Sequence, residues 1–207
     1  MLSFLNPAVR LIPRWLVYAV GFVPAALLGW GIYANTLGFD PLARLEHETG
    51  IWALRFLIAA LCVTPLMRLV RLNLVRFRRA LGLLGFYYAM MHLAVWVWLD
   101  HWFNWGAIWA EILKRPYITI GMVAAVILVP LAASSNDLAV RRLRAEAWKR
   151  LHWWAYPATA LGAIHFLLVV KAWPPEPLIY CGIVAVLLAW RALPSRRARK
   201  RPMAQAG

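Results

Sequence analysis

The chain has 207 residues, of which 63% are hydrophobic and only 15% are charged. A soluble domain usually has about 45–50% apolar and about 25% charged residues, so the composition excludes a soluble globular protein. The net charge of +15 would suit a nucleic-acid-binding protein, but its distribution along the chain argues against that class.

Six long apolar segments follow one another, and each is close to the ~20 residues that a transmembrane helix needs. The sequence therefore predicts an all-α integral membrane protein with six transmembrane helices in a single domain, residues 1–207. The predicted spans cover residues 13–34, 50–68, 80–100, 116–133, 150–172 and 176–193, and a basic tail follows at 194–207.

The charged residues divide unequally between the two sides of these spans. Most of the 23 basic residues lie before the first span, in the second and fourth connections, and in the tail. Most of the eight acidic residues lie in the other connections. Because basic connections stay in the cytoplasm, both termini are predicted to be cytoplasmic. The positive charge then serves topology and contact with anionic lipids, and we expect no nucleic-acid partner.

The first connection, at residues 35–49, is short and acidic, and His47 within it is predicted to be a solvated loop histidine. Arg55 lies about one and a half turns inside the second span. It is either an arginine whose long side chain reaches back to the headgroups or one half of a salt bridge to an anionic group near the outer face.

Three histidines lie within the third and fifth spans. His92 is well inside the third span, and His152 and His165 are both in the fifth. Pro157 lies between the last two and is expected to kink that helix. An ionisable side chain within the hydrocarbon is costly and commonly marks a functional site.

The depth of each histidine decides which of them can face each other. His92 lies about 18 Å from the inner end of its span and His165 about 22 Å, at 1.5 Å per helical residue. Both are therefore in the outer half of the membrane, whereas His152 is close to the cytoplasmic face. We expect His92 and His165 to face each other across the bundle.

Two neutral imidazoles from facing helices are a standard axial pair for a b-type haem that transfers electrons. Gly162 and Ala89, each about one turn before one of these histidines, would leave room for the porphyrin. The chain contains no Cys-x-x-Cys-His sequence, so such a haem would be bound non-covalently. The alternative is that each histidine only hydrogen-bonds to a carbonyl of a neighbouring helix. In the haem interpretation, Arg55 is a candidate partner for a propionate group.

One haem is more consistent with the sequence than two. The residues of the third span that are level with His152 are Arg78 and Arg79 rather than a histidine. His152, Arg78 and Arg79 instead form a cationic cluster on the inner side. This cluster suits a quinone, a flavin or a second haem, or it is ordinary interfacial charge.

Several segments resemble a known group of membrane haem proteins. They are TGIWALRFL, CVTPLMRLVR, RRALGLLGFYYAMMH, RPYITIGMVAAVILVPLAASSND and WKRLHWWAYPATALGAIHFLLVVK. Together they resemble the haem-binding membrane subunits of the bacterial periplasmic methionine-sulfoxide reductase system, within the ferric-reductase-like transmembrane group. The similarity covers essentially all six spans. It departs mildly at LMRLVR, where a more basic pair is expected directly after the Thr-Pro.

The resemblance implies a function that the residues alone do not define. Such a subunit lies in the bacterial inner membrane and carries electrons outward through haem b. It delivers them to a soluble periplasmic reductase that holds a molybdenum cofactor and repairs oxidised methionines. Its electrons come from the quinone pool, with or without a bound flavin such as FMN. The functional histidines of the family correspond to His92, His152 and His165.

The chain has no G-x-G-x-x-G dinucleotide fingerprint, so the donor would be a quinone, a bound flavin or a separate cytosolic flavin reductase. We predict an electron-transfer subunit of an oxidoreductase rather than a complete enzyme. The competing interpretations are a stand-alone ferric or cupric reductase, a transporter or proton channel that uses His92 and His165 as a relay, and a purely structural assembly factor.

Overall fold

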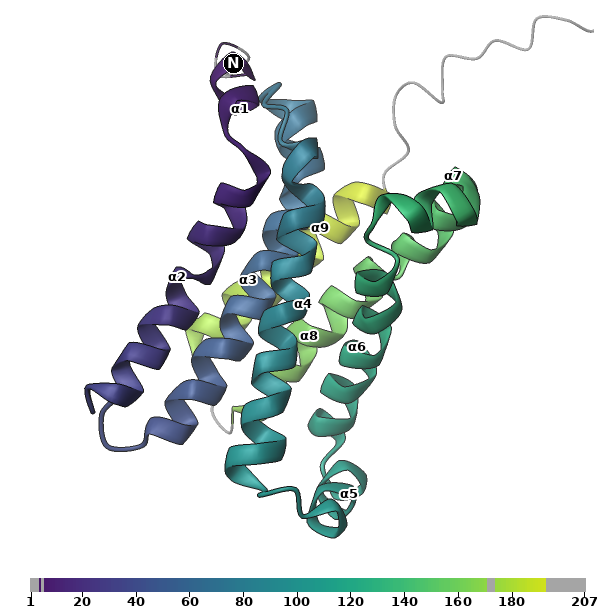
Figure 1. Ribbon diagram of the computed structural model, residues 1–207. Coiled ribbons are helices and arrows are strands. Elements are labelled where there is room, and N and C mark those ends of the chain that lie inside the picture. Colours follow the sequence, from purple (N-terminus) through teal and green to yellow (C-terminus); the bar gives the residue numbers. More distant parts are fainter. Residues whose placement is uncertain (1–3, 5, 171–173, 193–207) are drawn as a thin grey trace, which may run out of the picture.

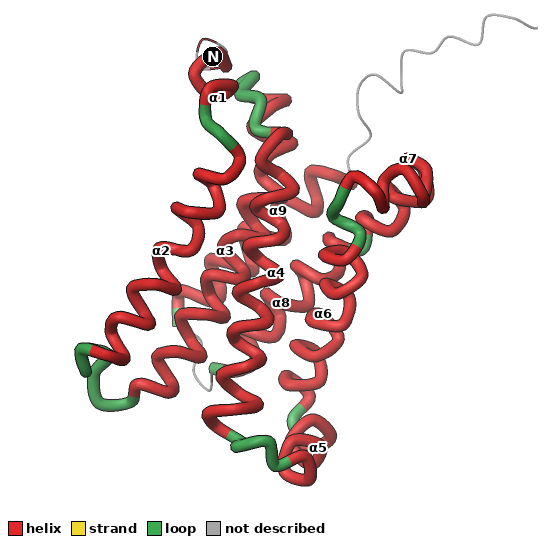
Figure 2. The backbone as a smooth tube through the Cα atoms, in the orientation of Figure 1, coloured by secondary structure: helices red, strands yellow, loops and turns green. Residues whose placement is uncertain are grey.

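The computed structural model describes residue 4, residues 6–170 and residues 174–192. All regular elements in this part of the chain are helices, as Figures 1 and 2 show, and the predicted all-α membrane fold is confirmed. The helices that build the bundle are α2 (Arg14–Tyr33), α3 (Pro41–Leu69), α4 (Arg78–Ala94), α6 (Pro116–Ala133), α8 (Ala155–Val169) and α9 (Pro175–Ala192). The other elements are α1 (Asn6–Leu11), α5 (Trp105–Lys114), α7 (Asp137–Trp153), the short 3-10 helix Val75–Phe77 and the π-helix Val95–Asp100.

Five helices in the described part of the chain are long and apolar enough to cross a membrane, namely α2, α3, α6, α9 and the continuous helix Val75–Asp100 that contains α4. The helix α8 has only 15 residues, or about 22 Å, which is shorter than the ~30 Å hydrocarbon core. The count of six spans therefore stays a prediction. The predicted tail at 194–207 and residues 171–172 of the fifth predicted span lie outside the described residues.

The predicted fifth span is divided into two helices. Its first residues belong to α7, and α8 begins only at Ala155, after a break at Trp154. Pro157 is the third residue of α8, where its missing N–H costs no hydrogen bond. In an uninterrupted helix the ring would clash with the carbonyl of Trp153, four residues earlier. The proline therefore ends one helix and starts another, instead of kinking a single span.

Two predicted outer loops contain helical residues. The helix α3 begins at Pro41, where Asp40 caps it by accepting a hydrogen bond from the Ala43 N–H over 3.0 Å. His47 is therefore on a helix, and the prediction of a loop histidine was wrong. Likewise α5 forms within residues 100–115, where the Asn104 side chain caps it. Local capping by Asp40 and Asn104 produced helices where the sequence had indicated only connections between spans.

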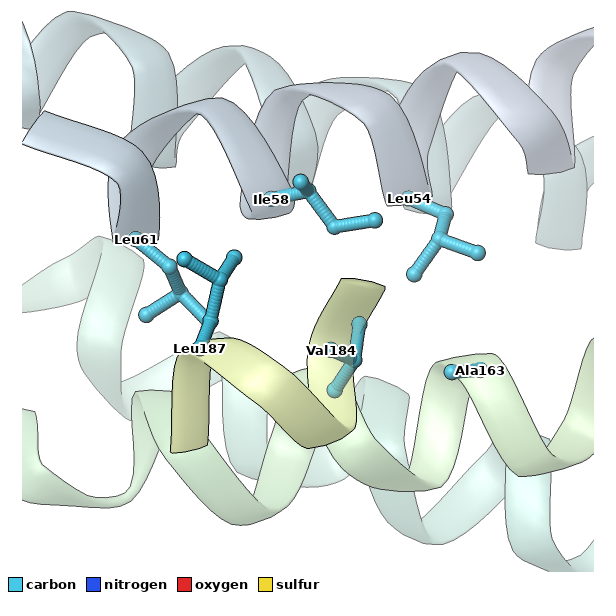
Figure 3. Packing of buried hydrophobic residues seen from close by; sticks show 6 residues of the cluster. All are labelled: Leu54, Ile58, Leu61, Ala163, Val184 and Leu187. Carbon is cyan, nitrogen blue, oxygen red and sulfur yellow. The ribbon is translucent and has the colours of Figure 1, made fainter. Parts of the chain in front are cut away.

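The core is centred on α3, as Figure 3 shows. Leu54, Ile58 and Leu61 of α3 pack against Ala163 of α8 and against two residues of α9, Val184 and Leu187. A second cluster joins three helices through Leu57, Leu128 and Ala158. The helices α3, α4, α6 and α8 thus surround the middle of the bundle, and α2 lies outside α3 and α4 (Figure 1).

The outer helix α2 is attached to α4 through Tyr88. The Tyr88 hydroxyl donates to the Gly21 carbonyl over 2.8 Å and accepts from the Ala25 N–H over 3.0 Å. Ala25 and Gly21 are four residues apart, so the hydroxyl is inserted into the hydrogen-bond ladder of α2 beside Pro24. Such an insertion bends a helix, and here it also joins two helices through a fully buried side chain.

Candidate functional site

His92 on α4 and His165 on α8 lie face to face in the middle of the bundle. The centroids of their rings are 6.1 Å apart, and the ring planes are at 73° to each other. The two residues are far apart in sequence and on different helices, so the pair exists only because α4 and α8 both pack around the centre. The structure thus brings together the two histidines for which depth had predicted a pair.

Each histidine is oriented by a backbone carbonyl. His92 Nδ1 is 2.9 Å from the Glu46 carbonyl on α3, and His165 Nδ1 is 2.7 Å from the Tyr117 carbonyl on α6. A carbonyl can only accept, so in both rings Nδ1 carries the hydrogen and donates it. The Nε2 lone pair of each neutral ring remains available, which is the arrangement that metal-bound histidines commonly have.

A glycine makes room for each of these hydrogen bonds. Gly50 and Gly121 lie four residues after Glu46 and Tyr117, one helical turn beyond each acceptor. A Cβ at Gly50 would lie 3.1 Å from His92 Nδ1, and a Cβ at Gly121 would lie 2.8 Å from His165 Nδ1. The same local device, a carbonyl followed by a glycine one turn later, therefore seats both histidines.

Sequence reasoning had not identified these two glycines. It had named Gly162 and Ala89, each about one turn before a histidine on the same helix, as small residues that leave room for a porphyrin, and both line the cavity around the histidine pair. A Cβ at Gly162 would only meet Leu54 at 3.9 Å, an ordinary contact. The available signal was the position of Gly50 in TGIW and of Gly121 in TIGM, but nothing in the sequence says which helix faces which histidine.

A cavity of about 490 Å³ surrounds the histidine pair between α3, α4, α6 and α8. Its volume is in the range of sites for cofactors and other small molecules. Metal–imidazole bonds of about 2.0–2.1 Å place the ring centroids of two imidazoles on opposite sides of one metal ion about 6 Å apart. The observed separation, the free Nε2 atoms and the cavity therefore fit a bis-histidine haem.

Arg55 lies apart from this cavity. Its Nε donates to the Tyr180 hydroxyl over 2.7 Å, and its guanidinium is 3.8 Å from a Glu176 oxygen. The guanidinium also lies over the ring of Trp52 at 4.9 Å. Arg55 thus joins α3 to α9 and does not line the cavity, so the structure lends no support to the predicted propionate contact.

The inner cluster is also separate from the histidine pair. His152 Nε2 is 3.1 Å from the Ser134 hydroxyl, and its ring stacks on Trp148 with the centroids 3.9 Å apart. Arg79 of α4 pairs with Asp137, the first residue of the helix α7 that carries His152, over 2.7 Å. None of the three predicted residues of this cluster lines the cavity.

Several polar residues at the outer end of the cavity were not among the predicted site residues. The Arg115 guanidinium donates to the Tyr117 hydroxyl over 2.9 Å and pairs with Glu111 at 3.0 Å. His47 packs on Phe166, the residue after His165, with ring centroids 5.8 Å apart. These residues come from α3, α5 and the start of α6, so only the tertiary fold shows that they share one site.

A helical membrane bundle with two facing, carbonyl-oriented histidines is characteristic of membrane haem proteins, and comparison with known families agrees. Residues 49–163 match the family described as "Ferric reductase like transmembrane component". The chain belongs to this family of transmembrane redox proteins. The matched range includes His92, Gly50 and Gly121 and ends two residues before His165.

Particular relatives are similar over nearly the whole chain. The "Protein-methionine-sulfoxide reductase heme-binding subunit MsrQ" of Brucella anthropi is 50% identical over 194 residues, which is 92% of this chain and 86% of the relative. The protein of the same name from Brucella ovis is 50% identical over 190 residues, 90% of this chain and 84% of the relative. The resemblance predicted from the sequence is confirmed, and the chain is a multi-pass protein of the bacterial inner membrane.

Proposed function

We propose that this protein is the electron-transfer subunit of a methionine-sulfoxide reductase system and holds one haem b between His92 and His165. The single observation that carries the proposal is the facing pair of imidazoles, each with Nδ1 bonded to a carbonyl and Nε2 free. The names of the relatives, which describe a heme-binding subunit, support the same cofactor.

The residues of the chain prepare the site in three ways. The Glu46 and Tyr117 carbonyls hold both rings in one tautomer, so little reorganisation is needed when a metal binds. Gly50 and Gly121 let the rings lie close to the helices and leave the space between them open. The apolar inner wall of the cavity excludes water. A haem held by His92 and His165 would supply a reversible one-electron carrier, and a pair of histidine ligands would favour electron transfer.

The partners that we propose lie on opposite sides of the membrane. The acceptor is a periplasmic catalytic subunit with a molybdenum cofactor that reduces methionine sulfoxide in proteins. The donor is a membrane quinone, with or without FMN or a cytosolic flavin reductase. We propose the cationic cluster of His152, Arg78 and Arg79 as the region where a donor is met. In this function the chain is one subunit of an oxidoreductase rather than a complete enzyme.

The test is a reduced-minus-oxidised optical spectrum of the purified protein, together with the haem content per chain. It is recorded for the unmodified protein and for His92→Ala, His165→Ala and His152→Ala. We expect about one haem per chain, lost in His92→Ala and His165→Ala and kept in His152→Ala, because His152 lies outside the cavity. His152→Ala is the matched control for removing a histidine from the inner side.

The other outcomes decide between the competing functions. Loss of the signal in all three variants would contradict a single haem and indicate a second one at His152. A protein that binds no haem at all would sink the electron-transfer proposal and favour a histidine relay. A stand-alone metal reductase would be favoured if the haem-loaded protein reduced ferric or cupric ions as fast without a periplasmic partner as with one.

A further inference from the structure

The two ends of the cavity differ in chemical character. The inner end is lined by apolar side chains such as Leu57, Leu128 and Ala158. Apart from the two facing histidines, the polar side chains that line it belong to its outer end, and they are Glu46, His47, Asp100, Glu111, Arg115 and Tyr117. A planar group with one apolar edge and one anionic edge, such as haem b, therefore fits with its anionic edge outward.

Arg115 is the only arginine or lysine among the described residues that line this cavity. Its backbone is extended, with φ −116° and ψ 99°, as expected for the residue before a proline. Its side chain is held by the Tyr117 hydroxyl and by Glu111. A guanidinium has five N–H donors, so it retains donors for a further anion.

The carboxyl groups at the same end mean that an anionic ligand needs a cationic residue beside it. Glu46, Asp100 and Glu111 all line the outer part of the cavity. Two added propionates would be repelled by the ionised carboxylates of Asp100 and Glu111, and the His101 ring, 3.2 and 3.8 Å from them, offsets this only when it is protonated. Arg115 is the charge that offsets this repulsion, and a guanidinium fork matches the geometry of a carboxylate.

We propose that Arg115 binds the propionate groups of the haem and thereby sets the orientation of the haem in the cavity. The inference rests on the proposed function, because it concerns the haem that His92 and His165 would hold. It assigns to Arg115 the role that the sequence had suggested for Arg55, whose guanidinium is held by α9 residues instead.

The test compares haem with haem dimethyl ester, in which neither propionate carries a charge. The full chain is purified without haem and reconstituted in detergent with either compound. The variants are Arg115→Gln and Arg115→Lys, and Arg55→Gln is the matched control. Arg55 is also bonded to a tyrosine hydroxyl and paired with a glutamate, but it lies outside the cavity. The readouts are the rate of haem release to an acceptor protein and the midpoint potential.

With haem, we expect Arg115→Gln to release it about tenfold faster, because the propionates lose their cationic partner. Removal of a nearby positive charge also disfavours the reduced state. At fixed ambient potential the ratio of reduced to oxidised haem should fall about tenfold, or ~59 mV for a one-electron couple. Arg115→Lys should keep most of both properties, and Arg55→Gln should match the unmodified protein. With the dimethyl ester, the unmodified protein and Arg115→Gln should release the compound at equal rates, because no charged propionate remains for Arg115 to bind. The potentials should still differ, because the Arg115 charge acts on the iron through space.

Three results would overturn the inference. One is equal haem release and equal potential in Arg115→Gln and the unmodified protein. Another is a difference in release rate that persists with the dimethyl ester, since Arg115 would then act on the fold through Tyr117 and His165 rather than on the propionates. The third is a loss in Arg55→Gln instead of Arg115→Gln. Failure of the unmodified protein to bind haem would overturn the proposed function itself.

Discussion

Each histidine ring can lie close to its neighbouring helix only because that helix has a glycine at the point of contact. At Gly121 a Cβ would lie 2.8 Å from His165 Nδ1 and 2.9 Å from its Cε1, so the ring would have to move. At Gly50 the corresponding distances to His92 are 3.1 and 3.3 Å. Both glycines therefore make room for a histidine ring, and the space at Gly121 is the tighter of the two.

We expect Gly121→Ala to lower the haem content of the purified protein to less than half, and Gly50→Ala to lower it less. The added methyl group pushes the imidazole away from its carbonyl and out of line with the opposite ring. The measurement is the haem-to-protein ratio, with the midpoint potential of whatever haem is retained.

Gly82→Ala is the control for these glycine variants. Gly82 lies on α4, and a Cβ there would have nothing within 4 Å. Replacing a helical glycine by alanine at such a position should favour folding by about 0.5–1 kcal/mol and leave the haem content unchanged. If Gly121→Ala kept its full haem content, the role given to this glycine would be wrong.

At the scale of whole helices, α2 depends on α4 for its attachment. The helix has few buried residues, Gly21 and Gly31, and Tyr88 supplies a hydrogen-bonded connection at its bend. The ring of Tyr88 also lies among Phe22, Trp52 and Phe56, with centroids 5.3 to 6.4 Å away. One side chain therefore links three helices.

We expect Tyr88→Phe to lower the free energy of unfolding by about 1–2 kcal/mol, because interhelical hydrogen bonds in membrane proteins are worth about 0.6 and at most ~1.7 kcal/mol each. The variant keeps the ring and its packing but leaves the Gly21 carbonyl and the Ala25 N–H without the hydroxyl. Reversible unfolding in a denaturing detergent measures the change.

Tyr87→Phe is the matched control. Tyr87 is the neighbour of Tyr88 in the sequence, it is 41% exposed, and its hydroxyl makes none of the hydrogen bonds that attach α2. Its stability should stay within about 0.5 kcal/mol of the unmodified protein. Equal stability of the two variants would show that the inserted hydroxyl contributes nothing to the attachment of α2.

The helix α5 lies between the ends of α4 and α6, at the end of the bundle opposite α1 and α7, which the charge asymmetry predicts to be the outer end (Figure 1). Trp105, Trp109 and Leu113 recur every fourth residue and are exposed, whereas Ile108 is buried and Glu111 faces the cavity. An exposed apolar stripe of this kind suits the membrane interface, where tryptophan is favoured. Most of the connection that the predicted spans leave at residues 101–115 is thus a helix, and it lies beside the mouth of the cavity.

At the scale of the whole molecule, α1, α7 and the last turns of α9 lie at one end of the bundle and α5 at the other (Figure 1). This arrangement agrees with the charge asymmetry, since the basic residues of α7 and those near α1 then share one side. The short helix α8 is the one whose crossing of the membrane needs a direct test.

We expect cysteines at positions 39 and 174 to react with a membrane-impermeant maleimide from the periplasmic side, and a cysteine at position 138 to react only after lysis. The variants are Phe39→Cys, Pro174→Cys and Leu138→Cys, made after Cys62 and Cys181 are replaced by serine. Positions 39 and 138 are separated by three predicted spans, and positions 138 and 174 by α8 alone. Labelling of positions 138 and 174 from the same side would contradict the crossing of α8.

The sequence was sufficient for properties that depend only on position along the chain and on depth in the membrane. The bounds of α2 and α6 agree with the predicted spans to within one residue, because a run of apolar residues reports directly on burial in lipid. The matching depth of His92 and His165 follows from a constant rise per residue. Charge asymmetry likewise needs no knowledge of packing.

Only the tertiary structure decided which residues meet around the cavity. Each helical residue is rotated by about 100° from the one before it, so depth says nothing about the face on which a side chain lies. Arg55 and His92 are both in the predicted outer half, yet Arg55 turns towards α9, while Arg115, between α5 and α6, lines the cavity. Gly50 and Gly121 gain their role from histidines on other helices, and this rotation is fixed only when the helices pack.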